Sequence, residues 1–152
     1  MKAITIIQPW ATLIALGEKK FETRSWSTKH RGELAIHAGK KVDREACETE
    51  PIKSALAKYG YTADNLPTGA IVATCQLEEC WQIERLNWKA VTKPVQFTAT
   101  NGRQSLWAGC IEGNKEYHFG NYEHGRYAWE LSDVKRLVKP FRAKGQQGLW
   151  NW

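Results

Sequence analysis

Three features of other protein classes are missing from this chain of 152 residues. Its four cysteines, at positions 47, 75, 80 and 110, form no Cys-x-x-Cys pair, and no histidine stands at ligand spacing from them, so no structural zinc site is expected. No apolar run approaches the length of a membrane span. Met1 leads into a mixed segment without the apolar region of a secretory leader, so we expect a cytoplasmic protein with reduced thiols and no membrane partner.

The composition is that of a soluble globular protein. Apolar residues make up 42% and charged residues 25% of the chain, and its length suits a single domain over residues 1–152. Lysine and arginine number 22 against 16 acids, which gives a net charge of +6 and favours polyanionic partners. Eight tryptophans are unusual, since large planar side chains both stiffen small cores and stack on nucleobases. We expect a monomer.

The most informative segment is the octet GEKKFETR at residues 17–24. If residues 21–24 form a strand, side chains alternate between its faces, so Glu22 and Arg24 point one way and Thr23 the other. Lys19 arrives from the preceding turn. The octet therefore predicts an acid and two bases on one small polar surface, in a concave cleft that solvent reaches together with Gln8 or His37.

The remaining pattern indicates an α+β fold. An apolar strand is expected over residues 3–7, followed by a helix that Pro9 begins and Gly17 ends. Strands are expected over residues 21–26 and 34–38. Further elements are predicted as a helical turn at 43–48, a helix from Pro51 to Gly60, a strand at 70–77, and a strand at 126–137 that Pro140 ends. Residues 80–124 show no clear period and suggest a long excursion with short strands, whereas Trp129 and Trp150 are assigned to the core.

Six segments in the right order resemble the ASCH domain family. They are QPWA at 8–11, the octet at 17–24, RGELAIHA at 31–38, GAIVA at 69–73, GRYAWE at 125–130 and GLW at 148–150. The resemblance covers nearly the whole chain. It implies a small PUA-like β-barrel flanked by helices, a cleft lined by the octet, and an association with RNA, either as a binding module or as an occasional enzyme.

The resemblance and the polar segments together select a set of candidate site residues. Candidate binding residues are Gln8, Trp10, Lys19, Glu22, Arg24, Trp26, His37 and Lys40, and candidate catalytic residues are Lys19, Glu22 and Arg24. Each has a structural alternative. Lys19 and Glu22 can form an ordinary surface ion pair, His37 can be a buried histidine bonded to backbone, and Trp10 and Trp26 fit core or rim packing better than base stacking.

Two classes of function stay open. In the first, the chain binds RNA or a nucleotide, with Arg24 and lysines on phosphate and Glu22 on a base edge. In the second, the same cleft hydrolyses RNA by acid–base chemistry, with a divalent metal as a possible aid and no other cofactor. ASCH-like hydrolases of acylated cytidine nucleosides use a Lys-x-x-Thr pair, whereas here Glu22 stands at that position and Thr23 one step further, which counts against this activity.

Overall fold

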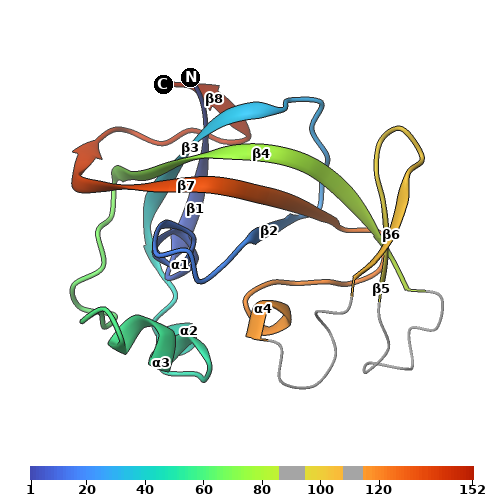
Figure 1. Cartoon of the computed structure of the whole chain (residues 1–152). Helices are drawn as coiled ribbons and strands as arrows, with labels where there is room; N and C mark the ends of the chain where they lie inside the picture. The colour runs from blue at the N-terminus through green and yellow to red at the C-terminus, as the bar shows by residue number, and fades with distance from the viewer. Residues whose placement is uncertain (86–94, 108–114) are drawn as a thin grey trace. The chain divides into compact units, whose positions relative to one another are not determined.

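The computed structural model describes residues 1–85, 95–107 and 115–152 (Figure 1). Its elements run in chain order as β1 (Lys2–Gln8), α1 (Trp10–Ala15), β2 (Phe21–Arg24), β3 (Gly32–Val42), α2 (Arg44–Cys47), α3 (Ile52–Ala57), β4 (Ala70–Glu84), β5 (Val95–Thr98), β6 (Gln104–Trp107), α4 (Lys115–His118), β7 (Tyr127–Arg142) and β8 (Leu149–Asn151). Long strands and short helices confirm the predicted α+β class. None of the helices in the described part of the chain is long and apolar enough to cross a bilayer.

The strands are hydrogen-bonded in the order β2-β7-β4-β3-β1-β8, with β5 paired to β4 and β6. Among the residues that the structure describes, no pairing joins β2 to β8. The α+β arrangement is therefore observed, whereas closure of the sheet into a barrel stays a prediction.

The chain divides into two compact units. The first unit contains residues 1–19, 32–76 and 132–152, and the second contains residues 20–31 and 77–131. Strands β4 and β7 each contribute residues to both units. The expectation of a single domain stays a prediction.

The first unit is built on β1, which is parallel to β3 and antiparallel to β8. Ala3 lies opposite Trp150, and both belong to a buried cluster with Ala35 and Ile71. The two ends of the chain meet here, since the amino group of Met1 donates a hydrogen bond of 3.0 Å to the carbonyl oxygen of Trp152 (Figure 1). The prediction that Trp150 belongs to the core is confirmed.

Two residues, Pro9 and Gly17, mark the ends of helix α1. Pro9 stands at its N-cap, where a missing backbone N–H costs nothing, and Gly17 follows its end with a φ of 75° that an L side chain rarely adopts. Every residue from Ala11 to Ala15 is buried. The helix therefore stabilises the first unit by packing and confirms the prediction.

The second unit contains β2, which is antiparallel to the first residues of β7. Glu22 lies opposite Trp129, and the Trp129 side chain is fully buried, which confirms its assignment to the core. A second buried cluster includes Trp81, Ile83 and Phe97. This unit thus has an aromatic core of its own.

Several strands, among them β4 and β7, are longer than the sequence pattern predicts. β4 continues past residue 77 to Glu84. The prediction that Pro140 ends the second strand is wrong, because β7 continues to Arg142. Pro140 is exposed, and proline is tolerated in a strand where the missing N–H would face solvent. The short strands expected within residues 80–124 are present as β5 and β6, while residues 86–94 and 108–114 lie outside the described residues.

Candidate functional site

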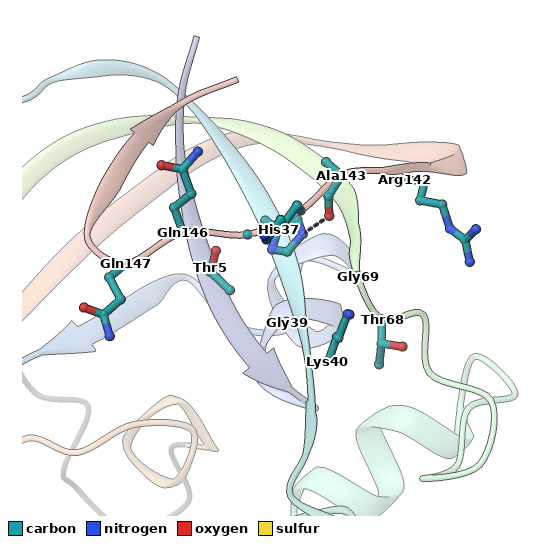
Figure 2. A pocket seen from close by; sticks show the side chains of 12 residues that line it. Thr5, His37, Gly39, Lys40, Thr68, Gly69, Arg142, Ala143, Gln146 and Gln147 are labelled. Atoms are coloured by element: carbon teal, nitrogen blue, oxygen red, sulfur yellow. Dashed lines mark hydrogen bonds between the residues drawn. The ribbon is translucent and has the colours of Figure 1, made fainter.

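A cleft of about 950 Å³ opens on the first unit (Figure 2). Its walls come from β1 and β3, from the end of β7, and from the segments that precede β4 and β8. The lining residues are Thr5, His37, Gly39, Lys40, Thr68, Gly69, Arg142, Ala143, Lys144, Gly145, Gln146 and Gln147. The volume falls in the range of small-molecule and cofactor sites.

Strand register places the first side chains of this cleft. Thr5 and His37 are partners in the parallel pairing of β1 and β3, so their side chains leave the sheet on the same face. The indole N–H of Trp150 donates to the Thr5 hydroxyl at 3.1 Å, and the Trp150 ring meets the His37 ring edge to face at 5.5 Å. A fixed polar floor results.

Backbone hydrogen bonds hold the segments around Gly69 and Ala143 beside β3. The N–H of Gly69 donates to the carbonyl of Ala38 at 2.8 Å, and the N–H of Ala143 donates to the carbonyl of Gly69 at 3.1 Å. Gly69 has a φ of 64°, a conformation that glycine adopts without strain. The residues from Arg142 onward are therefore held at the edge of the cleft by hydrogen bonds.

His37 has a defined tautomer in this arrangement. Its side chain is 2% exposed, and Nε2 lies 2.7 Å from the carbonyl oxygen of Ala143, as the dashed line in Figure 2 shows. A carbonyl oxygen only accepts, so Nε2 carries a proton, and Nδ1 is an acceptor when the ring is neutral. Nδ1 is buried and has no hydrogen-bond partner among the described residues. The predicted alternative of a buried histidine bonded to backbone is thus observed, and one acceptor remains.

Gly145 covers the His37 ring. A Cβ atom built on Gly145 would lie 2.7 Å from Cε1 of His37 and 2.7 Å from Oγ1 of Thr5. Such distances are far inside van der Waals contact, so only glycine allows the backbone to approach here. The width of the cleft at its floor depends on this residue.

The charged side chains at the rim of the cleft have one sign. Lys40, Arg142 and Lys144 are exposed, and no aspartate or glutamate is among the lining residues. Figure 2 shows Lys40 and Arg142 on one side of His37 and Gln146 on the other. Within the described part of the chain, none of the three cations forms an ion pair. The cleft can therefore receive an anion and donate hydrogen bonds to it.

The part of the octet from residue 20 to residue 24 forms a different kind of polar region, in the second unit. Glu22 and Arg24 point to one face of β2, with Arg24 Nε 3.3 Å from Glu22 Oε1. Glu22 is only 9% exposed and Arg24 is half-buried. The second carboxylate oxygen of Glu22 is buried and has no hydrogen-bond partner among the described residues. The acid and the base are thus brought together, with one acceptor atom unused.

Residues near α4 surround β2 in the same unit. The carboxylate of Glu116 accepts the backbone N–H groups of Lys20 and Phe21 at 2.9 and 2.8 Å, which fixes the start of the strand. Burial, with the negative charges of Glu116 and Glu22, raises the pKa of the Tyr122 phenol. The phenol is therefore a neutral neighbour of Glu22. Sequence reasoning missed both Glu116 and Tyr122, because no local pattern connects them to the octet.

Two candidates in the first unit, Gln8 and Lys19, are buried. Gln8 is fully buried and donates its two amide protons to Thr12 Oγ1 and the carbonyl of Pro67, each at 2.7 Å. Both N–H donors of the Gln8 amide are therefore engaged within the protein. The side chain of Lys19 is buried, since the residue is only 1% exposed. Its backbone N–H donates to the carbonyl oxygen of Leu13 in α1. Lys19 is thus buried rather than solvent-reachable, and the alternative of a surface ion pair does not describe it. Trp10 is half-buried.

Trp26 and Thr23 are engaged within the second unit. The half-buried Trp26 ring meets the Trp129 ring edge to face at 4.9 Å, the rim packing that was the structural alternative. The hydroxyl of Thr23 accepts the backbone N–H of Asn121 at 2.9 Å. Thr23 therefore contributes to holding a neighbouring loop.

The described cysteines are buried thiols. Burial raises the pKa of Cys75 to about 12 and also raises the pKa of Cys47 and Cys80, so these thiols stay protonated and poorly nucleophilic at neutral pH. Cys110 lies outside the described residues. Across residues 1–85, 95–107 and 115–152, no group of three His, Cys, Asp or Glu side chains is placed to hold a metal ion.

The family assignment follows from a match along most of the sequence. The family model described as ASCH domain matches residues 4–141. The chain belongs to the ASCH family. Activating signal cointegrator 1 of Homo sapiens is 34% identical over 80 residues, and that of Mus musculus 35% identical over 80 residues. Each match covers 51% of this ASCH chain and 14% of the relative, so the chain corresponds to a small part of those proteins.

The crystal structure of ASCH from Zymomonas mobilis is 14% identical, with a TM-score of 0.49, over 98% of this ASCH chain and 85% of that chain. In this ASCH chain, sequence reasoning named His37 and Lys40 but missed the cleft residues Arg142, Lys144 and Gln146. The five basic residues between positions 135 and 144 are a signal that could have indicated Arg142 and Lys144.

Proposed function

We propose that this ASCH chain binds RNA or a nucleotide, with phosphate in the cleft of the first unit. The observation that carries the proposal is the set of three exposed cations, Lys40, Arg142 and Lys144, in a concave lining without a carboxylate. Among the described residues these cations form no ion pair, so no internal ion pair has to break when an anion binds. Phosphate oxygens accept charge-assisted hydrogen bonds from such side chains, and arginine offers a two-pronged donor.

The other lining groups suit the remainder of a nucleotide. Gln146 and Gln147 carry amides that both donate and accept, and Thr68 carries a hydroxyl. Side chains of this kind read base edges or sugar hydroxyls in single-stranded RNA. The net charge of +6 adds long-range attraction for a polyanion. The RNA association that the family resemblance implies supports the same ligand class.

The direct test is titration of a fluorescein-labelled single-stranded RNA with the protein, followed by anisotropy at several salt concentrations. If phosphates are bound, the logarithm of the association constant falls linearly with the logarithm of salt concentration, with a slope of about −0.7 per phosphate contact on single strands. A mononucleotide should compete with the labelled RNA. Absence of RNA and mononucleotide binding at low salt contradicts the proposal.

A hydrolase is the second candidate, and the unused oxygen of Glu22 favours it. A buried carboxylate with a vacant acceptor is suited to removing a proton from a hydroxyl or water, while the neighbouring Arg24 would clamp phosphate. We expect ribonuclease chemistry rather than hydrolysis of acylated cytidine, because Glu22 replaces the threonine of that motif and the Thr23 hydroxyl holds Asn121.

Glu22→Gln separates the two functions. The amide keeps the shape of the side chain but takes no proton at neutral pH, so turnover should fall by about 10²–10⁴-fold if Glu22 is a general base. RNA cleavage and acylcytidine hydrolysis should be assayed with and without magnesium or manganese. Activity that survives the substitution removes Glu22 from catalysis, and no activity in wild type leaves the binding function alone.

A further inference from the structure

The positive charge of the chain is concentrated near its C-terminal end. Residues 132–152 hold five lysines or arginines and one aspartate, a net charge of +4 out of +6 for the whole chain. The five basic residues are exposed, and among the residues that the structure describes only Lys135 of the five forms an ion pair, with Nζ 3.8 Å from Asp133. This segment therefore carries most of the field that attracts a polyanion.

Two large aromatic side chains are exposed in the same segment. Phe141 is 58% and Trp152 39% exposed, and their ring centroids are 5.6 Å apart at an interplanar angle of 63°. Trp152 is fixed by two backbone hydrogen bonds to Met1, at 2.8 and 3.0 Å. The pair is an ordered aromatic surface in contact with water, although burial of such rings would be favourable.

The aromatic pair adjoins the cleft along β7. Phe141 and Arg142 are consecutive residues of the strand, so their side chains leave it on opposite faces, about 3.4 Å apart along the chain. Arg142 lines the cleft, and Phe141 stands beside Trp152. Lys139 shares the face of Phe141 by the same alternation. Cations therefore flank the rings on both faces of the strand.

We infer that a base of single-stranded nucleic acid stacks on one ring of the Phe141–Trp152 pair and meets the edge of the other, while the phosphate of the adjacent nucleotide occupies the cleft. The inference rests on the proposed function and adds a second contact to it. Every base has a π-face, so aromatic stacking beside a basic groove is how proteins hold single strands without reading sequence. The charge around the rings favours this occupant over an apolar protein surface, which would leave Lys139 and Arg142 without counter-charge.

The experiment compares a short single-stranded RNA with a mononucleotide on Phe141→Ala and Trp152→Ala. Loss of one stacked base should weaken oligonucleotide binding by roughly five- to 150-fold and leave the salt slope unchanged, because no charge is removed. Mononucleotide binding in the cleft should stay at the wild-type value. DNA of the same sequence should respond in parallel, since the contact involves the base.

Two controls define the contact. Tyr59→Ala removes another exposed aromatic residue, near α3, and should not change affinity. Phe141→Trp should retain binding, while Phe141→Leu keeps apolar bulk without a π-face and should bind as weakly as Phe141→Ala. Thermal melting of each variant establishes that it is folded.

Three results would overturn the inference. Wild-type oligonucleotide affinity in Phe141→Ala and Trp152→Ala, with a folded protein that still binds the mononucleotide, removes the rings from the site while the cleft proposal stands. Failure of wild type to bind either ligand refutes the proposed function and this inference together. Co-sedimentation of wild type with phosphatidylserine vesicles, lost in both variants while RNA affinity is unchanged, would assign the rings to a membrane surface instead.

Discussion

In the first unit, Lys40, Arg142 and Lys144 line an open cleft that contains no carboxylate, whereas in the second unit Glu22 and Arg24 face each other with little exposure. The three cations of the cleft are exposed to water and can exchange that water for an anion. The Glu22–Arg24 pair is already neutralised, so an incoming ion would have to displace a partner. Removing one member also leaves a charge in a poorly solvated place.

The sequence predicts that Glu22 and Arg24 share one cleft with His37, whereas the cleft that His37 lines belongs to the first unit and the Glu22–Arg24 pair to the second. Substitutions in the basic cleft should reduce affinity for ligand and spare stability. Substitutions in the Glu22–Arg24 pair should first affect the free energy of unfolding. The two outcomes are measurable independently, by binding titration and by denaturation.

The largest expected effect is on ligand binding by the triple variant Lys40→Gln, Arg142→Gln, Lys144→Gln. Loss of these charged contacts should weaken RNA binding by about 3 kcal/mol or more, which is roughly 100-fold. The salt slope should fall by about two, because each lost phosphate contact contributes about 0.7. The urea midpoint should stay at the wild-type value, since exposed cations contribute little to folding.

A matched variant tests whether position or total charge matters. Arg44→Gln, Lys53→Gln and Lys58→Gln together remove the same three charges from exposed side chains near α2 and α3. Affinity should fall much less than in the cleft variant. Equal losses in the two triple variants would show that the protein attracts RNA by its overall field alone.

Next in size is Arg24→Ala, measured by urea denaturation. The carboxylate of Glu22 would be left mostly buried without its cation, so the free energy of unfolding should fall by about 1–3 kcal/mol. If the variant keeps its stability but loses RNA affinity, Arg24 belongs to the ligand site, as the octet predicts, and the Glu22–Arg24 pair is not mainly a stabilising contact.

Glu79→Gln should cost about 1–2 kcal/mol of folding free energy at neutral pH. Burial alone would raise the pKa of Glu79, but the N–H of Cys80 and the guanidinium groups of Arg31 and Arg103 outweigh it and lower the pKa. A lowered folded-state pKa stabilises the protein above the unfolded-state value, about 4.3, and this contribution is lost as pH falls through the folded-state value. The gap between wild type and variant should therefore close below about pH 4. A gap that persists in acid would argue for lost packing.

The smallest effect is expected for Arg44→Ala. Arg44 forms an ion pair with Asp64 in which both side chains are well exposed, so solvent screens the attraction. The melting temperature should not change measurably. A clear drop would show that exposed pairs in this protein are stronger than the comparison assumes.

Local signals predicted the elements that depend on neighbouring residues. Pro9 and Gly17 bracketed α1, apolar spacing and Pro51 indicated α3, and alternation put Glu22 and Arg24 on one face of β2. Each of these follows from backbone geometry within a few residues. The family assignment was also accessible, because its motifs are short and ordered along the chain.

The cleft could not be predicted from local signals in the same way. It depends on the register of β1 with β3, on the hydrogen bonds of Gly69, and on the continuation of β7 through Pro140. These are contacts between residues far apart in sequence. A proline usually predicts the end of a strand, and here solvent exposure removed the penalty. Gly145 likewise has no local signature, since its requirement arises from the His37 ring.

Strands β4 and β7 extend through both compact units, and this limits how the protein can be divided. Two of the four chain crossings between the units fall inside strands, between Gln76 and Leu77 in β4 and between Leu131 and Ser132 in β7. A fragment cut there would end in the middle of a strand and leave ladder hydrogen bonds open. We therefore expect that neither half folds as a module by itself. Duplication, fusion or transplantation should preserve this ASCH chain from β1 to β8 as one inheritable piece.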